Sequence, residues 1–230
     1  MPRRSTGSDA VADQPDARRN ELEAILRRGP VIPVVTMTDP ALAVPLARAL
    51  LEGGLEVIEV TLRTEAAAEA IGRITAELPA MAVGAGTVLS PRQLEQVARL
   101  GAAFAVSPGL TAELLVAARS VPVPLLPGVA TASELMLASE HGHRLLKLFP
   151  AEPAGGVQLL QALAGPFPEA RFCPTGGIGP ANAPSYLACS NVLCVGGSWP
   201  TPPDAVAAGD WERIRGLARA ARALRTEAGR

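Results

Sequence analysis

Short apolar runs alternate along the chain with Ala- and Leu-rich stretches, each long enough for one helix. There are eight such runs, spaced roughly 20 to 27 residues apart. They cover residues 31–37, 55–62, 81–88, 104–109, 123–129, 144–150, 171–177 and 192–198. Parallel strands buried on both faces have this continuous apolar character, and eight strand–helix units close a barrel. The pattern therefore predicts an α/β fold, a single (β/α)8 TIM barrel.

A doubly wound open sheet is the alternative fold. Such a sheet usually carries a GxGxxG turn after its first strand, whereas here the first run is followed by VTMTDPALA, which has no such turn. The helix signals are ordinary: Asp39-Pro40 and Ser90-Pro91 each combine a capping residue with a proline at the first helical position, and both stretches stop at glycine. The barrel is favoured.

Length and composition indicate one domain and exclude several classes of protein. We expect a mobile leader over residues 1–20, without the apolar run of a signal peptide, and a barrel domain over 21–230. A net charge of −1 with scattered basic residues argues against a nucleic-acid partner. No apolar stretch approaches the roughly 18 residues of a membrane helix. Three cysteines without a CxxC pair fit a soluble protein of the reducing cytoplasm.

The two histidines, His141 and His143, stand two residues apart in EHGHR. Their position between a predicted helix and a predicted strand favours a solvated turn over a metal-binding pair. We therefore expect neither a metal nor another cofactor.

Lys147, in LLKLFP, is the most anomalous residue of the predicted strands. An ammonium inside a parallel strand faces either the barrel interior or the helix layer, and both locations penalise its charge. A neutral lysine is a nucleophile toward carbonyl groups and forms an imine with them. The alternative is a core lysine paired with a carboxylate for structural reasons.

The second run supplies partner groups. In VIEVTLRT the two-residue period of a strand places Glu59, Thr61 and Arg63 on one face. Catalytic groups of such barrels lie at the C-terminal ends of the strands, which is where these residues fall. A Glu59–Arg63 ion pair that fills the end of the barrel is the structural alternative.

Other strand ends carry weaker signals. Thr87 ends the third run in VGAGTVL, where its hydroxyl can donate to a carboxylate. Pro108, Phe149 and Thr175 end further runs and are candidate pocket residues, although turn chemistry explains such residues equally well.

The last two runs end in TGGIGPAN and VGGSW. Glycine amides after the seventh and eighth strands of these barrels often form a phosphate site. Gly176, Gly177, Gly197 and Ser198 suit that role, which predicts a phosphorylated small-molecule substrate.

Taken in order, EVTLRT, VGAGTVL, SPGL, PGVAT, KLFPAE, RFCPTGGI and LCVGGSW resemble the 2-keto-3-deoxy-6-phosphogluconate (KDPG) and 4-hydroxy-2-oxoglutarate (KHG) aldolases over nearly the whole chain after the leader. The resemblance implies a cofactor-free class I aldolase and a homotrimer. It implies Lys147 as the Schiff-base lysine, Glu59 as general acid/base, and Arg63 and Thr87 as ligands of the pyruvate moiety. Gly176, Gly177 and Ser198 would hold the phosphate.

The resemblance also implies the reaction: cleavage of KDPG to pyruvate and glyceraldehyde 3-phosphate, and of KHG to pyruvate and glyoxylate. Some relatives end the first strand with Arg, whereas this chain reads VVTMTD, so a role for Thr36 stays open. A sister family acting on the galactonate epimer is expected to carry Asn in place of Arg63 and to lack FCPTGG, so the gluconate substrate is preferred.

Three further functions stay as alternatives. A metal-dependent aldolase would need clustered ligands, and the chain has only two histidines. Another phosphate-binding barrel enzyme, such as an epimerase or a thiamin phosphate synthase-like transferase, would leave Lys147 without a purpose. A non-catalytic barrel would bind a phosphorylated metabolite without turning it over.

Overall fold

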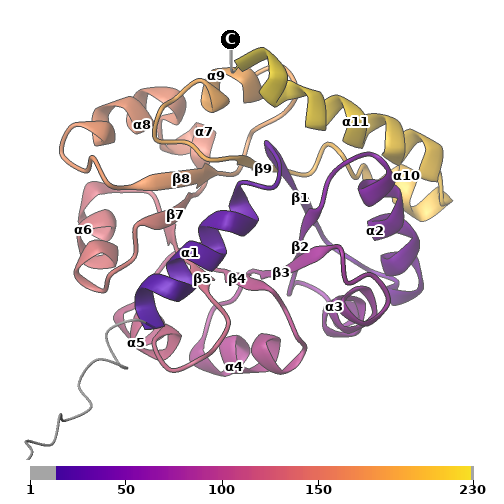
Figure 1. Ribbon diagram of the computed structural model, residues 1–230, viewed down its shortest axis with the longest axis horizontal. Helices are drawn as coiled ribbons and strands as arrows, with labels where there is room; N and C mark the ends of the chain where they lie inside the picture. The colour runs from indigo at the N-terminus through magenta and orange to yellow at the C-terminus, as the bar shows by residue number, and fades with distance from the viewer. Residues whose placement is uncertain (1–13, 229–230) are drawn as a thin grey trace, which may run out of the picture.

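Every predicted run contains a strand in the computed structural model, which describes residues 14–228 (Figure 1). The fifth run is divided in two at Pro127. The strands are β1 (Val31–Val35), β2 (Val57–Thr61), β3 (Ala82–Gly86), β4 (Phe104–Val106), β5 (Leu125–Leu126), β6 (Gly128–Val129), β7 (Leu145–Leu148), β8 (Arg171–Pro174) and β9 (Val195–Gly197).

The strands form a closed parallel ring. They pair in the order β5-β4-β3-β2-β1-β9 and, separately, β6-β7-β8, and each of these pairs is parallel. Pro127 alone joins β5 to β6, and a bridge between Thr175 and Gly196 links the end of β8 to β9. The predicted TIM-barrel fold is confirmed, and the doubly wound alternative is wrong.

Helices cover the outside of the ring (Figure 1). They are η1 (Pro40–Leu42), α2 (Ala43–Glu52), α3 (Ala66–Glu77), α4 (Pro91–Arg99), α5 (Ala112–Ala118), α6 (Ala132–Glu140), α7 (Ala151–Ala154), α8 (Gly156–Ala164), α9 (Ala183–Leu187), α10 (Pro203–Ala208) and α11 (Trp211–Ala228).

Both predicted helix starts are confirmed. Asp39 accepts a hydrogen bond from the backbone N–H of Ala41, and Ser90 accepts one from that of Gln93. A side-chain acceptor at this position satisfies an N–H group that the helix itself leaves unpaired.

The N-terminal end of the barrel is closed by α1 (Gln14–Leu26), which lies across the ring in Figure 1. Its Leu22, Ile25 and Leu26 are buried in one cluster with residues that begin the strands, such as Val57 and Leu145. This helix passes through the leader–barrel boundary expected after residue 20; the rest of the predicted leader, residues 1–13, lies outside the described part of the chain. Removing these apolar side chains from water explains why the helix docks.

The histidine turn lies between α6 and β7, as predicted, but its side chains are half-buried instead of solvated. His141 Nδ1 lies 3.0 Å from the Leu137 carbonyl oxygen. Burial, helped by the nearby charges of His141, Arg119 and Arg18, lowers the pKa of His143 to about 4. Cys173 and Cys189 form no disulfide, and over residues 14–228 no helix is long and apolar enough to cross a membrane.

Candidate active site

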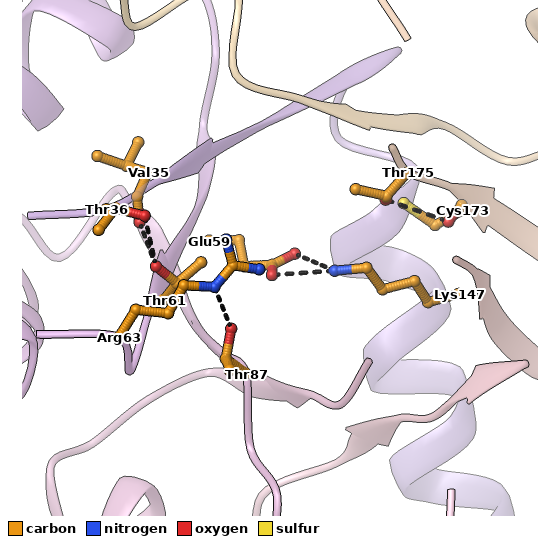
Figure 2. Close-up of polar contacts among 9 residues, drawn as sticks. All are labelled: Val35, Thr36, Glu59, Thr61, Arg63, Thr87, Lys147, Cys173 and Thr175. Carbon is orange, nitrogen blue, oxygen red and sulfur yellow. Dashed lines mark hydrogen bonds and ion pairs between the residues drawn. The ribbon is translucent and has the colours of Figure 1, made fainter. Parts of the chain in front are cut away.

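Lys147 and Glu59 meet inside the barrel. Residues alternate between the interior and the helix layer along a strand, so Val57, Glu59 and Thr61 of β2 share a side, as do Leu145 and Lys147 of β7. The Lys147 amine lies 3.2 Å from Glu59 Oε1 and 3.5 Å from Oε2 (Figure 2). Their side chains are only 6% and 5% exposed. Removing each of the two charges from water costs several kcal/mol. A buried ion pair therefore adds little to the stability of the fold, and apolar cores seldom contain one.

The glycines of β3 create the space for this pair. A Cβ on Gly86 would lie 2.2 Å from Glu59 Oε1, and a Cβ on Gly84 would lie 2.2 Å from the Phe104 ring. The structure shows that Gly86 accommodates the carboxylate itself.

Phe149 lies beside the Lys147 amine, and Thr175 follows β8, the strand that pairs with the strand of Lys147. The Lys147 amine lies 5.3 Å from the centroid of the Phe149 ring. Thr175 is 6% exposed, its Oγ1 lies 3.4 Å from the Cys173 carbonyl oxygen, and a Cβ on Gly196 would lie 2.3 Å from that Oγ1. Thr175 and Cys173 lie on the Lys147 side of the interior in Figure 2.

Pro108, the third candidate, follows β4 and is half-buried. A Cβ on Gly128 would lie 2.3 Å from the Pro108 carbonyl. Because Gly128 is the register partner of Lys147, Pro108 lies at the same level of the barrel as the lysine.

Arg63 and Thr87 lie at the rim, beyond the ends of β2 and β3. The exposed Arg63 donates from Nε to Thr87 Oγ1 at 3.0 Å (Figure 2). Thr87 has a φ of 62°, the one positive value among non-glycine residues of the described chain. A β-branched residue in this conformation is strained, so holding the Thr87 hydroxyl in this position costs conformational free energy. The Glu59–Arg63 ion pair does not form, because Glu59 pairs with Lys147.

Thr61, which strand alternation placed on the Glu59 face, and Thr36, whose role the sequence left open, lie beside the site. Thr61 Oγ1 donates to the Val35 carbonyl at 3.1 Å and lies 2.9 Å from Thr36 Oγ1. Thr36 therefore touches the interior face of β2, two residues from Glu59. The hydroxyl of Ser107, the residue before Pro108, is buried and has no hydrogen-bond partner within residues 14–228. Alternation along one strand cannot show that Thr36 reaches Thr61, because this contact joins two different strands.

The two glycine-rich turns lie side by side, joined by the Thr175–Gly196 bridge. Gly176 and Gly177 have φ values of 102° and 79°, in the left-handed region that favours glycine. Gly197 is buried, and a Cβ there would lie 1.8 Å from the Trp199 ring, so packing alone requires this glycine. Ser198 is exposed. The four predicted phosphate residues are thus brought together at one end of the barrel.

Comparison with known proteins relates this chain to one family of aldolases. A model of the family described as KDPG and KHG aldolase matches residues 22–217. The chain is 56% identical to the KHG/KDPG aldolase of Escherichia coli K12 over 88% of its own length and 95% of the relative. It is 55% identical to the 2-dehydro-3-deoxy-phosphogluconate aldolase of Dickeya dadantii over the same shares. The chain belongs to the KDPG and KHG aldolase family.

Solved structures of this family superpose on the barrel. The KDPG aldolase of Legionella pneumophila, with pyruvate captured as a covalent carbinolamine intermediate, has a TM-score of 0.86 and 46% identity, covering 87% of this chain and 97% of that one. A structure named native KDPGal matches with a TM-score of 0.78 and 28% identity, over 87% and 96%. Within the family, the chain is thus closer in sequence to these KDPG aldolases than to that KDPGal protein.

Proposed function

We propose that this family member is a class I aldolase that cleaves KDPG to pyruvate and glyceraldehyde 3-phosphate, and also KHG to pyruvate and glyoxylate. The observation that carries the proposal is the buried Lys147 amine within 3.2 Å of the Glu59 carboxylate. A nucleophile beside a group that can take its proton is the arrangement covalent catalysis needs. The names of the relatives and the carbinolamine of the Legionella enzyme support the same chemistry.

The first half of the reaction forms an imine. Glu59 first takes a proton from the Lys147 ammonium, and the neutral amine attacks the C2 ketone of the substrate. A second proton moves from the nitrogen to the ketone oxygen to give the carbinolamine, and Glu59 then returns its proton to the carbinolamine hydroxyl, which departs as water. The resulting iminium withdraws electrons from C3.

The second half breaks the carbon–carbon bond. Glu59 removes the proton of the C4 hydroxyl, the C3–C4 bond breaks, and its electron pair moves into the iminium to give an enamine and glyceraldehyde 3-phosphate. Glu59 then protonates the enamine carbon, and water hydrolyses the pyruvyl imine to release pyruvate and free Lys147. One carboxylate therefore acts as base and as acid in turn.

The remaining candidates hold the ends of the substrate. Arg63 and Thr87 bind the C1 carboxylate through a guanidinium and a hydroxyl donor. Phe149, Thr175 and Pro108 line the space next to Lys147. The phosphate of KDPG lies on the two glycine turns, at residues Gly176, Gly177, Gly197 and Ser198. KHG has no phosphate and forgoes these contacts.

Two finer properties are part of the proposal. A homotrimer is expected from the resemblance to this family, and a cytoplasmic location from the three cysteines without a CxxC pair. The runner-up function is a 2-dehydro-3-deoxy-6-phosphogalactonate aldolase, and a non-catalytic barrel that binds phosphorylated metabolites is the third; Arg63 after β2 argues against the galactonate epimer.

Borohydride reduction in the presence of pyruvate, followed by intact mass and peptide mapping, tests the proposal. We expect one reduced pyruvyl adduct on Lys147, and none on Lys147→Ala. Release of pyruvate from KDPG, coupled to lactate dehydrogenase, should be lost in Lys147→Ala and unaffected by a chelator in the unmodified protein. Absence of any adduct in folded protein would favour an epimerase or a binding protein.

A further inference from the structure

The Gly176–Gly177 turn is held from behind by two side chains that the proposed reaction does not use, Glu152 of α7 and Tyr186 of α9. We propose that these two residues, the Glu152–Tyr186 clamp, are positioning residues that set the affinity for the phosphate end of the substrate. The inference rests on the proposed function, because it concerns the turn that receives that phosphate.

Glu152 contacts the turn through its backbone and its side chain. Its N–H donates to the Gly176 carbonyl at 3.1 Å. Its Cβ and Cγ lie against Gly177, where an added Cβ would be 2.7 Å from both atoms. The side chain therefore fills the space behind the turn, which only a glycine at position 177 permits.

Tyr186 fixes the far end of that side chain. It is 1% exposed, and its hydroxyl donates to Glu152 Oε1. Burial, the hydrogen bond to Glu152 and the charge of Glu152 hold the pKa of Tyr186 well above its usual range, so the hydroxyl stays protonated and remains a donor. The carboxylate is thus drawn toward the helix layer, where the Tyr186 ring is part of the core.

The clamp determines which groups of the turn remain free for a ligand. The Gly176 carbonyl accepts from Glu152 N–H, and the Gly177 carbonyl accepts from Asn182 Nδ2 at 3.0 Å. The Thr175–Gly196 bridge turns the Gly176 N–H toward the Gly196 carbonyl, whereas the Gly177 N–H donates to no acceptor within residues 14–228. With both carbonyls of the turn bound on one side, the Gly177 N–H is left for an anion such as phosphate.

The Tyr186 hydroxyl holds the negative charge of Glu152 in place, in addition to packing against it. A carboxylate next to a phosphate site repels the ligand unless it is held elsewhere by a partner. Tyr186→Phe leaves the buried ring in place but releases a negatively charged side chain beside the turn. Glu152→Gln keeps an oxygen that accepts the tyrosine hydroxyl bond and removes the charge. Glu152→Ala removes the clamp altogether.

Steady-state kinetics with KDPG and with KHG separate a role at the phosphate from a general structural role. For Tyr186→Phe and Glu152→Ala we expect KM for KDPG to rise about fivefold to tenfold, the effect of losing one positioning hydrogen bond. Values for KHG, which has no phosphate, should change less than about twofold. Glu152→Gln should retain most of the affinity for KDPG. The matched control is Glu169→Ala, which removes an exposed ion pair with Arg144 at the other end of the barrel.

Direct titration with glycerol 3-phosphate, followed on the Gly176 and Gly177 amides by NMR, gives a readout without catalysis. Weaker binding in Tyr186→Phe, with binding in Glu169→Ala unchanged, supports the clamp even if the unmodified protein fails to cleave KDPG, in which case only the proposed function is wrong. An equal rise in KM for both substrates, or no change in KM and in glycerol 3-phosphate binding, overturns the clamp.

Discussion

Two pairs of residues occupy the C-terminal half of the barrel, and they are built in different ways. The inner pair, Lys147 and Glu59, consists of regular strand residues whose side chains are almost wholly buried. The rim pair, Arg63 and Thr87, lies after the strands have ended, with Arg63 exposed and Thr87 in a left-handed conformation.

The difference in burial between the two pairs indicates what each pair can do. A buried pair excludes water, so proton transfer between its members and a bound carbonyl is strongly affected by their exact spacing. An exposed guanidinium beside a hydroxyl is screened by solvent and suits recognition of a carboxylate. Chemistry is thus expected from the inner pair and affinity from the rim pair.

Glu59→Gln should have the largest effect and tests the inner pair directly. The amide keeps nearly the same shape against Gly86 but cannot take or return a proton. We expect kcat for KDPG cleavage to fall by about 10²- to 10⁴-fold. Borohydride trapping of pyruvate on Lys147 should also be slower. A variant with an unaltered cleavage rate would remove Glu59 from the mechanism.

Gly86→Ala should be the next most damaging change, because the new Cβ would meet Glu59 Oε1 at 2.2 Å. Displacing the carboxylate by even about an ångström is expected to lower kcat by roughly 10- to 100-fold. Gly72→Ala is the matched control: nothing lies within 4 Å of its Cβ position in α3, so it should stabilise the helix by about 0.5–1 kcal/mol without loss of activity. Equal kinetics in the two variants would contradict the assignment of Gly86.

Two substitutions of Thr87 distinguish its contribution to substrate binding from the backbone strain at this position. Thr87→Ala and Thr87→Gly both remove the hydroxyl that accepts from Arg63, so both should raise KM for KDPG about tenfold with a smaller effect on kcat. Only glycine relieves the left-handed conformation, so Thr87→Gly should be the more stable variant by about 1 kcal/mol. Chemical denaturation of both proteins measures this difference; a fall in kcat with KM unchanged would move Thr87 to the inner group.

His143 is expected to have the smallest effect on activity and provides a check from the opposite end of the barrel. Its pKa is lowered by burial from 6.5 to about 4, so the folded state binds its proton less readily than the unfolded state does. Its contribution to stability is therefore fully present above pH 6.5 and is lost as the pH falls toward 4, by up to about 3 kcal/mol.

His143→Gln removes this titration. The difference in unfolding free energy between His143→Gln and the unmodified protein should shift in favour of the variant as the pH falls from 6.5 to 4. Their kcat values at neutral pH should match, because α1 and the buried strand starts separate this turn from Lys147 and Glu59. A pH-independent difference in stability would argue against the lowered pKa.

Much of the site could be predicted from the chain because it depends on strand alternation. The period of two placed Glu59 and Thr61 on one face of β2, and the lone lysine in an apolar run identified Lys147. Thr36, Glu152 and Tyr186 could not be found in this way, since their contacts join segments that are far apart in sequence and lie at strand ends or in helices.

The sequence by itself determined the number and type of strand–helix units, because apolar periodicity and capping are local properties. It also determined which residues face the barrel interior. Only the tertiary structure decided which of those residues meet: Glu59 pairs with Lys147 and not with Arg63, Gly86 makes room for that carboxylate, and α1 closes the N-terminal end. The physical reason is that ring closure and helix docking fix distances between residues some 90 positions apart in the chain.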